Sequence, residues 1–317
     1  MGTKYKKEKV FKMWISGIIL LVGIGMIIFV SNRLTNIVIS PSRNPIDRAM
    51  EQEIKQKYII EGYYESLEKE DFNITSQDGH KLVGQLIKNP VASEKYIVLC
   101  HGYGFNRVGG IKYIEIFLKE GFNIVVYDHR NSGESEGQYT TMGYFEKEDL
   151  KLVIDYVYSR FGQQIILGTH GESMGAATVL LHGVEDQRIQ FVIADCPYSD
   201  LKDQLAYRLK IEHKLPRFPF MNIASLFAKI RAGFYFGQVS PIELMKQHNG
   251  LPNMPIMFIH GDADDYIPLA MSQELYGVKE GYKKIYIAKG AKHATSVCVD
   301  REKYASEVRD FLSDVVK

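Results

Sequence analysis

The feature that most limits how this chain can fold is an alternation of short β-rich runs with longer helical patterns, which begins at Phe72. Parallel strands need long crossover connections, so this alternation is typical of an α/β protein whose sheet carries helices on both faces. Several runs are continuously apolar, as buried central strands are. The predicted strands span residues 82–87, 96–100, 124–127, 165–169, 191–194, 256–259 and 284–287.

Helical periodicity lies between these runs and near the C-terminus, where Asp300 is a plausible N-cap for the last helix. Residues 201–250 depart from the alternation, because they contain no convincing strand and are too long for an ordinary connection. We interpret them as a helical cap insertion over the active site. The apolar faces of the two clearest helices carry Leu150, Val153, Ile154, Val157 and Phe161, and Tyr304, Val308, Phe311, Leu312 and Val315.

The N-terminus predicts one membrane-spanning helix. No charged residue interrupts the twenty residues between Lys12 and Arg33, and most of them are apolar. At ~1.5 Å per residue this helix is roughly 30 Å long, which matches the hydrocarbon thickness of a bilayer. A buried soluble helix is the alternative, although a terminal helix that is apolar all round would need burial on every face.

The basic residues around the run predict its orientation. Few follow it before residue 48, whereas five precede it, and this bias places the N-terminus in the cytoplasm and the bulk of the chain outside. A cleaved signal peptide competes, but residues 28–33 lack the small-x-small pattern that a signal peptidase reads. We therefore expect an uncleaved signal anchor in the cell membrane. The five preceding residues are Lys4, Lys6, Lys7, Lys9 and Lys12.

These patterns predict four regions: a basic cytoplasmic tail at 1–12, the anchor at 13–32, a juxtamembrane stalk or helix at 33–70, and the α/β domain at 71–317. Lys and Arg total 39 against 38 Asp and Glu, which gives no electrostatic footprint for nucleic acid. The three cysteines are too few for a disulfide framework and have no metal-ligand spacing, so neither a metal nor a cofactor is expected.

The chemistry begins at residues 165–177, where a predicted strand runs into Gly171-Glu172-Ser173-Met174-Gly175 and then a small-residue helix. This is the nucleophile elbow in its required context, and it makes Ser173 the candidate nucleophile. Side chains at the two flanking glycines would clash with neighbouring backbone. A second G-x-S-x-G string surrounds Ser135, but it follows a loop, lacks a following helix and places two carboxylates beside the serine.

An oxyanion hole needs two donors. The backbone N–H of Met174, directly after the nucleophile, is one candidate. The loop after strand 96–100 reads His101-Gly102-Tyr103-Gly104, and the N–H of Tyr103 is the other candidate. A plain glycine turn is the alternative reading of that loop.

The acid and the base are expected on later loops. Asp262, Asp264 and Asp265 follow the strand at 256–259, and only one of them can orient the histidine. His293 lies between the last strand and the final helix, and it completes the order Ser, Asp, His that is usual on this kind of sheet.

At these motifs the chain resembles the α/β-hydrolase superfamily, and in particular bacterial hydrolases similar to the catalytic domain of prolyl oligopeptidases. The resemblance covers residues 72–317 and rests on 101–104, 128–133, 171–175, 261–268 and 291–293. In the G-x-x-D-x-x-[VI]-P pattern at 261–268, Asp264 holds the family's acid position. The resemblance implies an eight-stranded, mostly parallel sheet, a catalytic triad and no cofactor.

The fold alone does not decide the substrate. We expect a small-molecule or lipid-like ester; a peptidase or aminoacyl hydrolase, or a non-catalytic tethered binding domain, is the alternative. Prolyl oligopeptidases carry a β-propeller that this chain lacks, which counts against a peptidase. The cap is rich in aromatic residues and has eight basic against three acidic residues, so it suits a lipophilic pocket, an anionic leaflet or anionic lipid-like esters.

Overall fold

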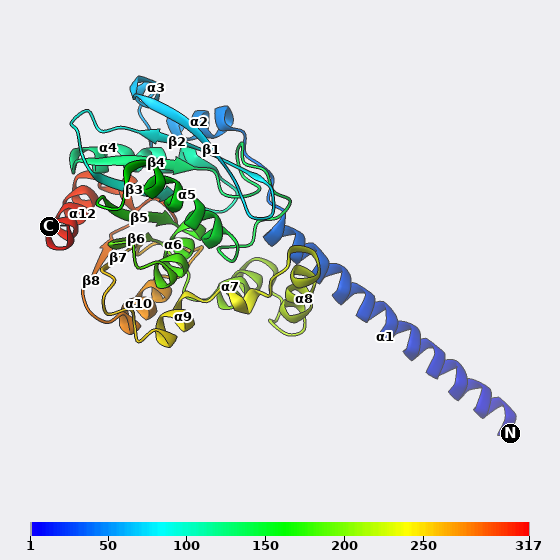
Figure 1. Ribbon diagram of the computed structural model, residues 1–317. Coiled ribbons are helices and arrows are strands. Elements are labelled where there is room, and N and C mark those ends of the chain that lie inside the picture. The colour runs from blue at the N-terminus through cyan, green and yellow to red at the C-terminus, as the bar shows by residue number, and fades with distance from the viewer. Residues whose placement is uncertain (1, 317) are drawn as a thin grey trace.

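The computed structural model describes residues 2–316 and contains a single eight-stranded sheet in the order β1-β2-β4-β3-β5-β6-β7-β8 (Figure 1). The strands β1, β2 and β4 pair antiparallel, and every other neighbouring pair is parallel. The predicted eight-stranded, mostly parallel sheet is therefore confirmed. The strands are β1 Lys69–Thr75, β2 Lys81–Ile87, β3 Lys95–Cys100, β4 Phe122–Tyr127, β5 Ile166–Glu172, β6 Phe191–Asp195, β7 Ile256–Gly261 and β8 Lys283–Ala288.

Helices connect these strands and extend the chain at both ends. They are α1 Gly2–Ile39, α2 Ile46–Lys55, α3 Tyr63–Ser66, η1 Arg107–Gly110, α4 Ile111–Lys119, α5 Glu146–Phe161, α6 Met174–Glu185, α7 Leu201–His213, α8 Phe220–Ala232, η2 Phe236–Gln238, α9 Pro241–Gln247, α10 Leu269–Val278, α11 Ser296–Val299 and α12 Arg301–Val315. Asp300 caps α12 as predicted, because its side chain accepts a hydrogen bond from the N–H of Lys303.

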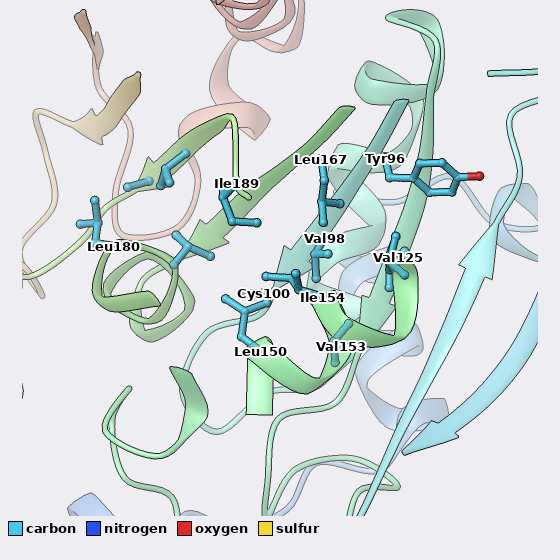
Figure 2. Packing of buried hydrophobic residues seen from close by; sticks show 14 of the residues in the cluster. Tyr96, Val98, Cys100, Val125, Leu150, Val153, Ile154, Leu167, Leu180 and Ile189 are labelled. Atoms are coloured by element: carbon cyan, nitrogen blue, oxygen red, sulfur yellow. The ribbon is translucent and has the colours of Figure 1, made fainter. Parts of the chain in front are cut away.

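The hydrophobic core has one layer on each face of the sheet. On one face α5, α6, α9 and α10 pack against the strands, and Figure 2 shows Leu150, Val153 and Ile154 of α5 beside Val98 and Val125. On the other face α4 and α12 contribute the buried side chains. Both layers consist of aliphatic and aromatic side chains from elements far apart in sequence, so they fix the carboxyl ends of the parallel strands in one rigid edge.

The sequence pattern does not predict the strand β1. It forms the sheet edge, and only Phe72 of its seven residues is buried. Because the remaining positions are polar or partly exposed, the strand has no apolar run to mark it. Phe72 lies opposite Gly84 of β2, where its ring occupies the space that a side chain would fill.

The apolar N-terminal run forms most of α1, a single helix that projects from the domain as a rod (Figure 1). Its length and composition would let it cross a membrane, although a signal sequence would satisfy the same criteria. Ser31 is the first buried residue along the described part of the helix, and Thr35, Val38 and Ile39 are buried further on. The last turns of α1 are therefore part of the folded domain.

The segment predicted as a stalk is also packed on the domain. Ala49 of α2, Ile59 and Tyr64 belong to the core layer formed with α4 and α12. The periodicity in this segment does correspond to a helix. Its apolar side has a partner surface on the domain, so residues 46–64 do not act as a free spacer.

The insertion at 201–250 is helical, as predicted, but its helices divide into two groups. α7 and α8 form a third hydrophobic cluster with the end of α1 and with Met174. α9 lies instead against α6 and α10, where it covers the sheet like an ordinary crossover helix. Within the insertion, α7, α8 and the short helix η2 are therefore separate from the sheet layers.

Candidate active site

The strand β5 runs directly into Ser173, which is the N-cap of α6 and has the backbone angles φ 57° and ψ −115°. A non-glycine residue in this conformation is strained by ~1–3 kcal/mol and persists only where its surroundings impose it. A Cβ on Gly171 would lie 2.2 Å from the carbonyl oxygen of Gly175, and one on Gly175 would lie 2.1 Å from that of Cys100. Both glycines are thus required by close backbone approach, as the sequence motif predicts.

Ser173, His293 and Asp264 come together at the carboxyl edge of the sheet. His293 Nε2 lies 2.9 Å from Ser173 Oγ, and His293 Nδ1 lies 2.8 Å from Asp264 Oδ2. Ser173 is mostly buried, and about a fifth of the His293 side chain is exposed. With Nδ1–H donating to the carboxylate, Nε2 can accept the serine proton.

Asp264 is held in position by several groups besides His293. Its side chain is fully buried, and its Oδ1 accepts the backbone N–H groups of Tyr266 and Ile267 at 2.9 Å. Burial alone would raise the pKa of Asp264, but hydrogen bonds from His260 and His293 bring that pKa below its usual value. The carboxylate is therefore ionised at neutral pH.

His260 is a residue of this site that the sequence did not reveal. Its Nε2 lies 2.9 Å from the carbonyl oxygen of Ile267 and 3.2 Å from Asp264 Oδ2, while its Nδ1 lies 2.7 Å from Ser272 Oγ. His260 is the second-last residue of β7, four residues before Asp264, and the chain bends between them. Only that bend brings the two side chains together, so no local motif marks the contact.

The competing residues have other roles. Ser135 is buried, its Oγ donates to the carbonyl oxygen of Asp128, and it accepts the N–H of Val83. Its hydroxyl proton is therefore already donated within the loop. Asp262 accepts the N–H of Gly290 at 2.6 Å, and Asp265 is exposed. Of the three aspartates, Asp264 is the one within hydrogen-bond distance of His293.

Both residues that carry the candidate oxyanion donors lie close to Ser173. Met174 is the first residue of α6, so helix geometry leaves its N–H without an intrahelical acceptor. Tyr103 lines the same cleft as Ser173 and His293. His101, two residues before Tyr103 in the same loop, is hydrogen-bonded through Nδ1 to the carbonyl oxygen of Gly102. Its Nε2 accepts a hydrogen bond from the backbone N–H of His129. Burial lowers the pKa of His101, which keeps the imidazole neutral in this role.

The end of α1 and the chain after it are hydrogen-bonded to this loop and to the neighbouring loop at Gly137. The Tyr103 hydroxyl donates to the carbonyl oxygen of Ile37, and Asn106 Nδ2 donates to that of Asn44 at 2.8 Å. Arg43 Nη2 in addition donates to the carbonyl oxygen of Gly137 at 2.9 Å. The end of the N-terminal helix and the following linker therefore hold the backbone that carries one candidate oxyanion donor.

A cleft of about 560 Å³ opens beside Ser173 and His293. Within the described residues, its walls include Glu53 and Tyr58 from the N-terminal segment and none from 201–250. This differs from the expectation that the insertion lies over the site and supplies a lipophilic pocket. The reason is that buried apolar side chains of the insertion pack against α1 and α6.

The floor of the cleft is charged. Lys112 Nζ lies 2.6 Å from Glu172 Oε2 and donates to the carbonyl oxygen of Ala294 at 3.0 Å, so it links the residue before Ser173 to the residue after His293. Burial opposes its charge, but Glu172 and Glu53 keep the pKa of Lys112 above its usual value.

Burial raises the pKa of Glu53 to about 7, and its Oε2 has no hydrogen-bond partner among the described residues.

The cap helix α7 supports the loop that carries Asp264. Gln204 Nε2 donates to the carbonyl oxygen of Tyr266 at 2.7 Å, and Arg208 Nη1 donates to that of Asp265 at 2.9 Å. The Arg208 guanidinium also lies 4.1 Å from the centroid of the Tyr266 ring. The insertion thus affects the site by positioning its acid loop.

Among the described residues, Cys196 Sγ, a carboxylate oxygen of Asp264 and an imidazole nitrogen of His293 are mutually close enough to hold a metal ion. Burial raises the pKa of the Cys196 thiol well above its usual value, and a protonated thiol is a poor metal ligand. The other two groups are already hydrogen-bonded to each other. This donor set suits proton transfer better than metal binding.

An eight-stranded sheet of this topology, with a strained serine between β5 and α6, defines a serine hydrolase of the α/β-hydrolase type. The chain belongs to the family described as serine aminopeptidase, S33, whose model matches residues 92–221. It is 37% identical over 254 residues to the uncharacterized protein YqkD of Bacillus subtilis, and the match covers 80% of this chain and 82% of that protein.

Solved structures have the same fold. The Pyrococcus furiosus esterase Pf2001 superposes with a TM-score of 0.67 and 26% identity, covering 88% of this chain and 99% of the esterase. An acylaminoacyl peptidase of Pyrococcus horikoshii gives a TM-score of 0.58 at 18% identity, over 78% of this chain and 41% of the peptidase. The predicted resemblance to α/β-hydrolases is therefore confirmed.

Proposed function

We propose that this chain is a membrane-anchored serine esterase in which Ser173 is the nucleophile, His293 the general base and Asp264 the residue that orients His293. The observation that carries the proposal is the continuous series of contacts from Ser173 Oγ through His293 to Asp264 at a strained strand-to-helix turn. Each contact is short enough for proton transfer or for fixing the tautomer.

In this mechanism Ser173 Oγ attacks the acyl carbonyl carbon while His293 Nε2 takes the hydroxyl proton. The N–H groups of Met174 and Tyr103 stabilise the oxyanion of the tetrahedral intermediate, where one such donor contributes about 3 kcal/mol. His293 then gives the proton to the departing alcohol. Water, deprotonated by His293, hydrolyses the acyl-enzyme to release the acid and restore Ser173.

An ester is the preferred substrate because the esterase Pf2001 is similar to this chain over nearly its whole length. An aminoacyl ester or peptide is the second candidate. Glu53 favours it, because a buried carboxylate oxygen without a partner in the cleft suits the ammonium group of an aminoacyl substrate. The family's description as a serine aminopeptidase is consistent with that reading.

The anchor part of the proposal rests on α1, whose described apolar side chains between Val10 and Phe29 are largely exposed on the isolated chain. A bilayer would cover them. The lysines before the span favour a cytoplasmic N-terminus and a catalytic domain outside the cytoplasm. In intact cells, added protease should digest the domain; digestion only after lysis would contradict this orientation.

The test of the activity uses the full chain in detergent micelles with matched ester, thioester and aminoacyl-anilide substrates. We expect the highest kcat/KM on esters and no turnover by Ser173→Ala. Faster cleavage of aminoacyl-anilides than of esters would favour the aminoacyl reading. Turnover of no acyl substrate by the folded protein would overturn the proposed function.

A further inference from the structure

The cap helix α8 lies against α1 at the point where α1 leaves the domain. Thr35 Oγ1 donates to the carbonyl oxygen of Ala224 at 3.0 Å, and Arg231 donates to Asn36. Figure 1 shows α8 beside α1 and away from the sheet. Residues 13–32 of α1 match the thickness of a bilayer, so α8 contacts the turns directly beyond that span.

The two sides of α8 are both apolar. One side carries Met221, Ala224, Ala228 and Ala232, which are buried against α1 and the domain. The other side carries Ile223, Leu226, Phe227 and Ile230, which we call the α8 stripe; their spacing of three and four residues places them on one face. Leu226 is 47% exposed and Ile230 is 70% exposed.

The apolar surface continues beyond the helix, because Phe218, two residues before α8 begins, is 73% exposed. A soluble helix normally presents polar side chains on the side opposite its packed face. The α8 stripe therefore needs a covering surface. The stripe lies beside the exposed apolar length of α1. A single surface can therefore cover both helices.

The charged residues of α8 and of the segments that flank it in sequence are all basic, and one of them, Arg217, pairs with Asp203 of α7 at 2.8 Å. The sequence from Lys214 to Tyr235 contains Lys214, Arg217, Lys229 and Arg231 and no acidic residue. Arg231 reaches Asn36 on α1, so a positive charge lies at the level where the span ends. An exposed apolar stripe flanked by basic residues is typical of a helix that lies in the headgroup region of an anionic leaflet.

We propose that α8 is an interfacial helix, which lies on the outer leaflet with the α8 stripe inserted among the acyl chains and its basic residues near anionic headgroups. This inference rests on the proposed anchoring by α1. It adds a second membrane contact that fixes how the domain is tilted on the bilayer. α8 and α7 belong to one hydrophobic cluster, and α7 holds the acid loop beside the cleft. The contact of α8 with lipid therefore also determines how the cleft is positioned relative to the membrane surface.

The test is lipid quenching of tryptophan fluorescence in the full chain, reconstituted in phosphatidylglycerol–phosphatidylcholine vesicles. Trp14 is the chain's one tryptophan, and it lies near the start of the predicted span, so the unmodified protein reports α1 insertion by itself. In a Trp14→Phe background, Ile230→Trp reports α8. The matched control is Ile287→Trp, because Ile287 is 42% exposed on β8, at the far edge of the sheet from α1 (Figure 1).

Lipids brominated at shallow acyl positions should quench about half of the emission of Ile230→Trp and little of that of Ile287→Trp, because interfacial helices bury their apolar face by ~5–10 Å. Equal, weak quenching of both variants with strong quenching of Trp14 would overturn the α8 contact but leave the anchor intact. Absence of Trp14 quenching would overturn both. A blue-shifted Ile230→Trp emission that bromine does not quench and that grows with protein concentration would show a second copy in place of lipid, and would also overturn the proposal.

Discussion

The N-terminal segment and the cap exchange the roles that their sequences suggest. Residues 33–70 look like a spacer, yet they supply a wall of the cleft and hold the loop of Tyr103. The insertion at 201–250 looks like a roof, yet α8 packs on α1 and α7 holds the acid loop from behind. A helical pattern thus predicts a helix, but only the surface that it meets decides its function.

The acid loop carries Asp264, and Asp264→Asn is the largest single effect that we expect. Loss of the carboxylate that fixes the His293 tautomer should lower kcat by about 10⁴-fold. Asp262→Asn is the matched control and should act mildly, because Asp262 accepts the N–H of Gly290 on the exposed surface. The measurement is kcat on a soluble ester, and an inverted ranking would move the acid to a neighbouring position.

The N-terminal segment can be separated from the anchor by two truncations. Removing residues 1–30 deletes only the projecting part of α1 and should leave turnover of a soluble ester in detergent nearly unchanged. Removing residues 1–58 deletes Ile37, Asn44 and Glu53, and should lower kcat/KM by at least about 100-fold, since small misplacements of catalytic groups cost that much. Equal activity of both forms would return this segment to the status of a spacer. Circular dichroism of the longer truncation distinguishes a misplaced loop from an unfolded domain.

Glu53, in the N-terminal segment, should make the stability of the folded protein depend on pH. Its pKa rises from 4.5 to about 7 on folding, so the folded protein binds a proton here that the unfolded chain releases, and stability falls as the pH rises through this window. Glu53→Gln should raise the free energy of unfolding by about 2–3 kcal/mol at pH 8 and change it little near pH 4.5. Denaturant unfolding at both pH values checks this. Destabilisation by Gln at pH 8 would mean that the ionised carboxylate has a stabilising partner.

The smallest effect should come from the cap's contact with the acid loop. Arg208→Ala removes the hydrogen bond to Asp265 and the stacking on Tyr266, and should lower kcat about two- to five-fold, as the loss of one partly exposed cation–π contact would. Lys210→Ala on the same helix is the control, because Lys210 is exposed. If the two variants behave alike, α7 does not position the loop.

The sequence predicts the site best where backbone geometry dictates residue type. Gly171 and Gly175 are needed because backbone atoms approach within side-chain distance, and the strand-to-helix context of their motif distinguishes Ser173 from Ser135. Contacts between segments that are distant in sequence do not require a particular local motif, so the sequence does not predict them. His260 meets Asp264 only through a bend, Lys112 joins two loops far from it in sequence, and β1 has a single buried residue at a sheet edge.

The central claim is that Ser173 is the nucleophile, and the most direct measurement is the position of a covalent fluorophosphonate adduct, found by mass spectrometry of the full chain. We expect the adduct on Ser173, its loss in Ser173→Ala and its retention in Ser135→Ala, because the Ser173 hydroxyl faces His293 while that of Ser135 is buried in a loop. An adduct on Ser135, or undiminished labelling of Ser173→Ala, would contradict the account.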